Sequence, residues 1–165
     1  MDHAAHSAEQ GAGRPSLNRL AFGATTHCLT GCSIGEVLGM VIGTALGWGN
    51  WPTVILSTVL AFVFGYLLTL LPLLRGGMEL GAALTLAFAS DTLSITIMEI
   101  VDNAVMVVIP GAMNAGLTDP LFWTSLIVSL VLAGIAAFPA NRWLIARGRG
   151  HALVHVHHAH HTLHQ

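Results

Sequence analysis

Long apolar segments, separated by short polar ones, dominate the chain. Each is close to or above the roughly 20 residues that a helix needs to cross a bilayer. We therefore predict an all-α bundle of transmembrane helices, with spans at about residues 20–48, 54–74, 80–109 and 121–144. The predicted domains are a disordered N-terminal segment, residues 1–18, the transmembrane part, residues 19–147, and a histidine-rich tail, residues 148–165.

Local signals mark the ends of these spans. Gly49 and Asn50 predict a tight turn after the first span, with Trp48 and Trp51 as interfacial anchors on either side. Pro139 lies late in the fourth span, where it predicts a kink or an end of the helix.

Polar residues concentrate in the first and third spans, whereas the centre of the second shows no charge and no obvious ligand and the fourth looks similarly plain. In the first span, Cys28, Cys32 and Glu36 fall on one helical face. Glycine recurs there at every fourth position, which predicts close packing of another backbone. These glycines are Gly31, Gly35, Gly39, Gly43 and Gly47.

The third span carries a second stripe, in which carboxylates and thioethers share an arc of about 100° with Ile95. Its polar and sulfur-bearing members are Asp91, Met98, Glu99, Asp102 and Met106. The depth of each residue follows from the helical rise per residue, counted from Leu20 in the first span and from Leu80 in the third. On this count we expect Cys32, Glu36 and Asp91 to meet at similar depth. Polar groups in a bilayer are costly and usually face a bundle interior, so both faces are predicted to point inward.

Composition supports a membrane protein, since 54% of the residues are hydrophobic and 8% are charged. All six basic residues are arginine, and they lie before the first span, between the second and third, and after the fourth. Arginine marks the cytoplasmic side, so both termini are predicted to be cytoplasmic, in a multi-pass protein of the bacterial inner membrane. A net charge of −2 without a basic cluster gives no support to a nucleic-acid partner.

A lipoprotein interpretation competes for the first span, because Leu29–Cys32 matches a short lipidation pattern. Thr25, Thr26 and His27 interrupt the signal core that such a protein needs, and apolar sequence continues past Cys32. We therefore expect a retained span.

Together these residues suggest a site for a transition-metal ion, copper or zinc, because thiolate, thioether and imidazole are soft or borderline ligands. The candidate ligands are His27, Cys28, Cys32, Glu36, Asp91, Met98, Glu99, Asp102 and Met106. The plainer interpretations are that the cysteines are small buried apolar residues, that the methionines fill the core, and that the outermost acids are solvated.

The motif His27-Cys28-x-x-Gly31-Cys32-x-x-Gly35-Glu36, with Asp91 and Met98-Glu99-x-x-Asp102-Asn103, resembles an uncharacterised family of four-span bacterial inner-membrane proteins, a domain of unknown function. The resemblance covers about residues 20–150. It implies the fold and a retained first span, and it leaves the activity open. A looser similarity links the methionines and glycine ridge to eukaryotic copper-uptake channels, but the methionine spacing and the fourth span differ.

The tail is dense in imidazoles, which suit a second metal site that buffers or regulates. Its histidines are His151, His155, His157, His158, His160, His161 and His164. A solvated tail, a residual purification feature and a pH sensor are the alternatives.

These features favour a transporter or channel for a transition-metal ion, and not an enzyme, since neither a nucleophile–base pair nor a phosphate loop is evident. A membrane thiol–disulfide oxidoreductase using Cys28 and Cys32, a proton or alkali-cation pathway through the acids, and a structural subunit whose glycine ridge binds a partner remain open. The expected partners are the lipid bilayer, further copies of the chain in a homo-oligomer and a cytosolic metal chaperone.

Overall fold

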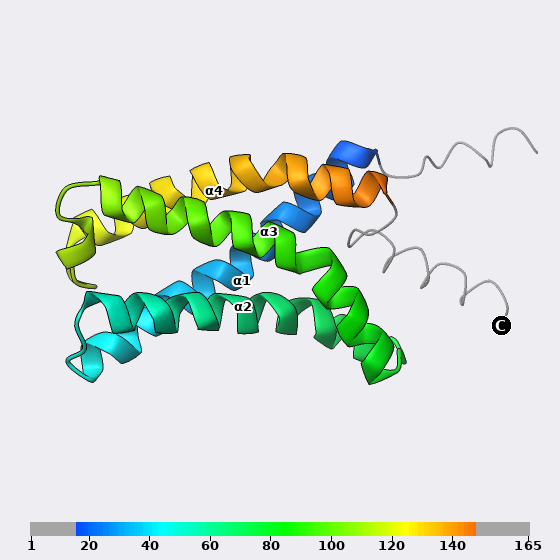
Figure 1. Ribbon diagram of the computed structural model, residues 1–165, viewed down its shortest axis with the longest axis horizontal. Helices are drawn as coiled ribbons and strands as arrows, with labels where there is room; N and C mark the ends of the chain where they lie inside the picture. Colours follow the sequence, from blue (N-terminus) through cyan, green and yellow to red (C-terminus); the bar gives the residue numbers. More distant parts are fainter. Residues whose placement is uncertain (1–15, 148–165) are drawn as a thin grey trace, which may run out of the picture.

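The computed structural model describes residues 16–147, which form an all-α bundle (Figure 1). Four helices in these residues are long and apolar enough to cross a membrane, as expected of a multi-pass membrane protein. They are α1 (Leu17–Ala45), α2 (Asn50–Arg75), α3 (Leu80–Val108) and α4 (Pro120–Ala146), with a short 3₁₀ helix, η2 (Ala112–Asn114), before α4. Consecutive helices are antiparallel, so α1 and α3 run in the same direction, and α1 crosses the bundle obliquely (Figure 1).

Local hydrogen bonds set the ends of α1. The helix begins at Leu17, inside the segment predicted to be disordered, because the Ser16 hydroxyl caps it by accepting from the Arg19 backbone N–H at 3.3 Å. It ends at Ala45, earlier than predicted, because Gly47 adopts a left-handed conformation with φ +66°. The turn therefore precedes Gly49, and Asn50, predicted to lie in that turn, is already the first residue of α2.

Large apolar side chains lie on the outside of the bundle, and small or polar ones fill the inside. Phe22, Ile55, Ile100 and Ile135 are each more than 60% exposed. The buried positions of α2, in contrast, recur at every fourth residue and are mostly small: Thr53, Ser57, Ala61, Gly65, Thr69 and Leu73. This distribution is typical of helices that pack closely against one another while their outer faces meet lipid.

The glycine ridge of α1 packs against this small face of α2, as the pattern predicted. A Cβ added at Gly31 would lie 2.6 Å from the Gly65 Cα, and one added at Gly35 would collide with the backbone of Ala61. One turn further on, Gly39 meets Ser57 and Gly43 meets Thr53 in the same way. Gly47 was wrongly included in this ridge, because it forms the turn after α1 and a Cβ there would meet nothing within 4 Å.

Helices α2 and α4 also supply polar side chains to the interior, contrary to the expectation that these two spans are plain. The Ser129 hydroxyl of α4 donates to Asp102, and Asn141 donates to the Thr25 hydroxyl of α1 at 2.9 Å. Pro139 does not end the helix, which continues to Ala146. In α4 the buried polar positions thus tie its inner face to both α1 and α3.

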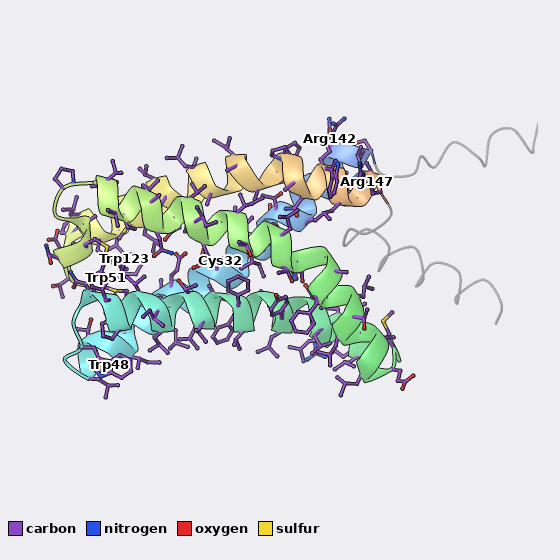
Figure 2. The ribbon with its side chains drawn as sticks, viewed as in Figure 1. Cys32, Trp48, Trp51, Trp123, Arg142 and Arg147 are labelled. Carbon is purple, nitrogen blue, oxygen red and sulfur yellow. The ribbon has the colours of Figure 1, made fainter. Side chains whose placement is uncertain are left out.

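The two ends of the bundle differ in chemistry. Trp48, Trp51 and Trp123 gather at the end that holds the α1–α2 turn and the α3–α4 loop, whereas Arg142 and Arg147 lie at the opposite end (Figure 2). We call the first the tryptophan end and the second the arginine end.

Candidate ion-binding site

The two predicted faces do point into the bundle. Cys28 and Cys32 of α1 are 2% and 1% exposed, and Figure 2 shows Cys32 near the middle of the molecule. Every acid that the pattern selected is also buried, with Glu36 7% exposed and Glu99 5% exposed. The residues that meet across the bundle fall into two groups at different levels.

The group nearer the tryptophan end consists of Glu36, Glu99 and Asp102, which we call the acid triad. Glu36 of α1 lies within electrostatic range of Glu99 and Asp102 of α3. Cys32 and Thr58 flank Glu99. Three carboxyl groups are therefore held close together by helices α1 and α3, with α2 and α4 supplying neighbouring hydroxyl groups.

A cavity of about 180 Å³ connects the acid triad to the tryptophan end. Its deep lining includes all three acids, while Trp48, Asn50 and Asn114 line it at the level of the turns. At 1.5 Å per residue, Glu36 lies about 14 Å below the end of α1. Asn50 donates to Asn114 at 3.0 Å and so joins the turn regions of the two hairpins beside this cavity. We call it the outer cavity; it has room for several water molecules.

Two acids of the triad form no well-aligned hydrogen bond, although Asp102 lies against Glu36 and the Thr58 and Cys32 side chains lie against Glu99. Both carboxylate oxygens of Glu36 and both of Glu99 are buried and accept no hydrogen bond of acceptable geometry from the described residues. Asp102, by comparison, accepts from Ser129. Burying an unpaired carboxylate is costly, and natural proteins retain such groups mainly where a cation or a proton is bound. Glu36 and Glu99 are both among the residues that line the outer cavity.

The second group lies nearer the arginine end and is fully hydrogen-bonded. Asp91 accepts from the Thr69 hydroxyl at 2.5 Å and from the Ser90 hydroxyl at 2.7 Å. The Thr69 oxygen also lies 3.3 Å from His27 Nε2. Because the Thr69 proton goes to Asp91, this bond needs the Nε2–H of His27 as its donor. Cys28 lies within electrostatic range of Asp91 and completes what we call the inner group.

The prediction that Cys32, Glu36 and Asp91 share one depth is wrong. Glu36 meets Glu99 and Asp102, whereas Asp91 meets Cys28 and Thr69. Asp91 and Glu99 are separated by about 12 Å of rise along the same helix. The offset arises partly because α1 begins at Leu17, before the residue from which the depth was counted.

A dry layer separates the two groups. Ile95 and Met98 of α3 are 0% and 1% exposed and belong to a buried cluster that also contains both cysteines. The Ile95 side chain fills the space beside Gly65, where an added Cβ would lie 2.6 Å from it. The cysteines therefore bridge the levels of the acid triad and the inner group, in surroundings from which water is excluded.

The predicted metal ligands do not form one ready-made centre. Within residues 16–147, no group of three or more His, Cys, Asp or Glu side chains is arranged so that it could hold a metal ion. Met106 lies apart from the buried stripe, half-exposed in the wall of the outer cavity. The tail histidines lie outside the described residues.

Sequence reasoning missed several residues that line or support the site. Met40, Met113 and Thr58 line the outer cavity, and Thr69 joins His27 to Asp91. For Thr69 a signal existed, since the four-residue spacing of small residues in α2 marks its buried face. No comparable signal selects Met113, because it lies in the loop around η2, whose position depends on the tertiary fold.

Comparison with known families matches residues 18–150 to the family described as "Domain of unknown function (DUF4396)". The chain belongs to this family. The match covers all four helices of the DUF4396 fold described above, and thus the acid triad and the inner group together. Searches of curated proteins and of solved structures found no match.

Proposed function

We propose that this protein is a membrane transporter or channel for a transition-metal ion, copper or zinc. The observation that supports this most is the outer cavity, with Glu36, Glu99 and Asp102 in its lining and no well-aligned hydrogen bond at Glu36 or Glu99. A cation bound there would supply a positive counter-charge for these two carboxyl groups. A sulfur ligand follows on the side of the acid triad that faces the arginine end, since Cys32 lies beside Glu99 and Glu36.

The route beyond the acid triad follows from the order of polar groups along α1 and α3. From the outer cavity the ion would pass Cys32, Met98 and Cys28, and then reach His27 and Asp91 of the inner group. The dry layer around Ile95 closes this route in the present conformation, so transport requires the layer to open. On this proposal the arginine end faces the cytoplasm, where the histidine-rich tail would receive the ion.

Metal content of the purified protein tests the proposal. The wild-type chain, in detergent or nanodiscs, is equilibrated with Cu(I) or Zn(II), desalted, and measured by mass spectrometry. The double variant Glu36→Gln/Glu99→Gln is expected to bind at least about tenfold more weakly. Glu79→Gln is the control for loss of a carboxylate outside the cavity, because Glu79 is exposed in the α2–α3 turn. Wild-type protein without metal above background would overturn the proposal.

A proton or alkali-cation pathway is the second candidate. It is favoured by the absence, within residues 16–147, of a preformed group of three metal-binding side chains. Buried carboxylates can relay protons without sulfur. Flux into liposomes that survives Cys28→Ser/Cys32→Ser and still requires Glu36 would support this candidate; flux lost with the cysteines would support the transition metal.

The remaining hypotheses have less structural support. The glycine ridge cannot serve as the docking face for a partner, because α2 already covers it. Both thiols are free and buried, so thiol–disulfide exchange would need a conformational change to reach them. Thiol alkylation that is the same after oxidant and reductant would remove the oxidoreductase hypothesis.

A further inference from the structure

Methionine side chains gather at the outer cavity. Of the five methionines in residues 16–147, three line this cavity: Met40, Met106 and Met113. They come from three separate elements, α1, α3 and η2, so the fold and not a local repeat brings them together. Met98, a fourth, lies buried in the dry layer, beyond the acid triad.

Met40 and Met106 pack against the buried cluster of Ala115, Phe122 and Leu126, and they also line the cavity, which Met78 does not. Met40, Met106 and Met113 are all half-buried, with part of each side chain facing the cavity. Met98, which is 1% exposed, shows what a fully packed methionine looks like in the same protein. Sulfur atoms at a cavity surface can contact an ion, whereas fully enclosed ones cannot without rearrangement.

The two kinds of ligand in this cavity have different preferences. Carboxylates attract any cation, and alone they favour hard ions. Thioethers are neutral and soft, and among biological metals they select Cu(I) over Zn(II). A lining that combines both would concentrate cations by charge and retain the softest of them by sulfur.

We propose that the outer cavity selects Cu(I), through the thioethers of Met40, Met106 and Met113, with the acid triad supplying the attracting charge. This inference rests on the proposed function and names its substrate. Zn(II) would bind only at the carboxylates, so its affinity would not depend on the thioethers. Ag(I), which shares the charge and softness of Cu(I) and is stable in air, is the experimental probe.

Conservative variants test the role of sulfur. Met40→Leu/Met106→Leu removes two thioethers at nearly constant volume, a change that usually costs less than about 1.5 kcal/mol of stability. Met78→Leu is the matched control, because Met78 packs beside Leu73 and Ala83, outside the cavity lining. Titration of Ag(I) is expected to show at least about tenfold weaker binding in the double variant and no change in the control. Zn(II) affinity should be the same in all three proteins.

A second measurement does not depend on any variant being stable for long. In protein labelled with ¹³C at the methionine methyl groups, Ag(I) should shift the signals of Met40, Met106 and Met113 and leave Met78 unshifted. Ag(I) binding that is unchanged by Met40→Leu/Met106→Leu, without shifts at the cavity methionines, would overturn the inference. If Zn(II) binds through Glu36 and Glu99 while Ag(I) does not bind, selection of Cu(I) is wrong and the proposed function stands. If neither ion binds the wild-type chain, both fail.

Discussion

At the scale of single residues, the buried acids fall into two classes, those that accept well-aligned hydrogen bonds and those that do not. Asp91 accepts hydrogen bonds from Thr69 and Ser90, so its carboxylate is part of the structure. Glu36 and Glu99 accept none, although each is more than nine-tenths buried. A protein that keeps such groups gives up stability, and the gain must lie in what they bind.

This difference predicts that two substitutions change the free energy of unfolding in opposite directions. Glu36→Gln should raise the free energy of unfolding in metal-free protein by roughly 1–3 kcal/mol, because it removes one of three buried acids that crowd together and breaks no well-aligned hydrogen bond. Asp91→Asn should lower it by a similar amount, because the amide cannot accept both hydroxyl hydrogen bonds equally well. Thermal or denaturant unfolding in a mild detergent measures both. Destabilisation by Glu36→Gln would show that this carboxylate has a structural partner within the protein.

At the scale of helices, α1 and α2 approach each other closely along the glycine ridge. Gly35 faces Ala61 so closely that no side chain fits between the two backbones. The same antiparallel register brings His27 opposite Thr69, two turns away along the same ridge. The glycine ridge therefore positions the inner group as well as holding the two helices together.

A pair of identical substitutions on α1 tests this packing. Gly35→Ala should destabilise the protein by about 1–3 kcal/mol, because its Cβ would overlap the α2 backbone and force the helices apart. Gly23→Ala is the control, since a Cβ there meets nothing within 4 Å. Alanine also favours helix over glycine by about 1 kcal/mol, so the control should be neutral or stabilising. Equal effects of the two variants on thermal stability would argue against a tight α1–α2 contact.

The sequence was enough to predict the four helices and their inward faces, because apolar length and helical spacing depend on local pattern. It was not enough for the relative depth of α1 and α3, which depends on where each helix begins and on how α1 crosses the bundle. The end of α1 was missed because Gly47 was assigned to the ridge, although its backbone conformation makes the turn. The role of Thr69 and Ser129 was missed because isolated hydroxyls in apolar spans look neutral until their acidic partners are placed opposite.

At the scale of the whole molecule, the polar groups run from the tryptophan end towards the arginine end. The outer cavity reaches the acid triad, and the layer around Ile95 separates it from the inner group. Such an arrangement, accessible from one side and closed to the other, is what a transporter in one of two conformations requires. The arginine distribution predicts that the tryptophan end, where the outer cavity lies, faces away from the cytoplasm.

Labelling of introduced cysteines tests which end of the molecule faces the cytoplasm. In a Cys28→Ser/Cys32→Ser background, Gly116→Cys in the α3–α4 loop should react with a membrane-impermeant maleimide in intact cells. Glu79→Cys in the α2–α3 turn should react only after permeabilisation, because that turn lies beside Arg75 at the predicted cytoplasmic end. The reverse pattern would place the outer cavity on the cytoplasmic side and contradict the predicted orientation.

Ion uptake into sealed proteoliposomes tests the central claim most directly, namely that the acid triad and the sulfur residues line a path for a transition-metal ion. Wild-type protein should carry Cu(I) or Zn(II) inward at rates well above empty liposomes, and Glu79→Gln should do the same. Glu36→Gln/Glu99→Gln should reduce uptake by at least about tenfold while the protein remains folded. Uptake by that double variant at the wild-type rate, or no uptake by the wild-type protein above empty liposomes, would contradict the account.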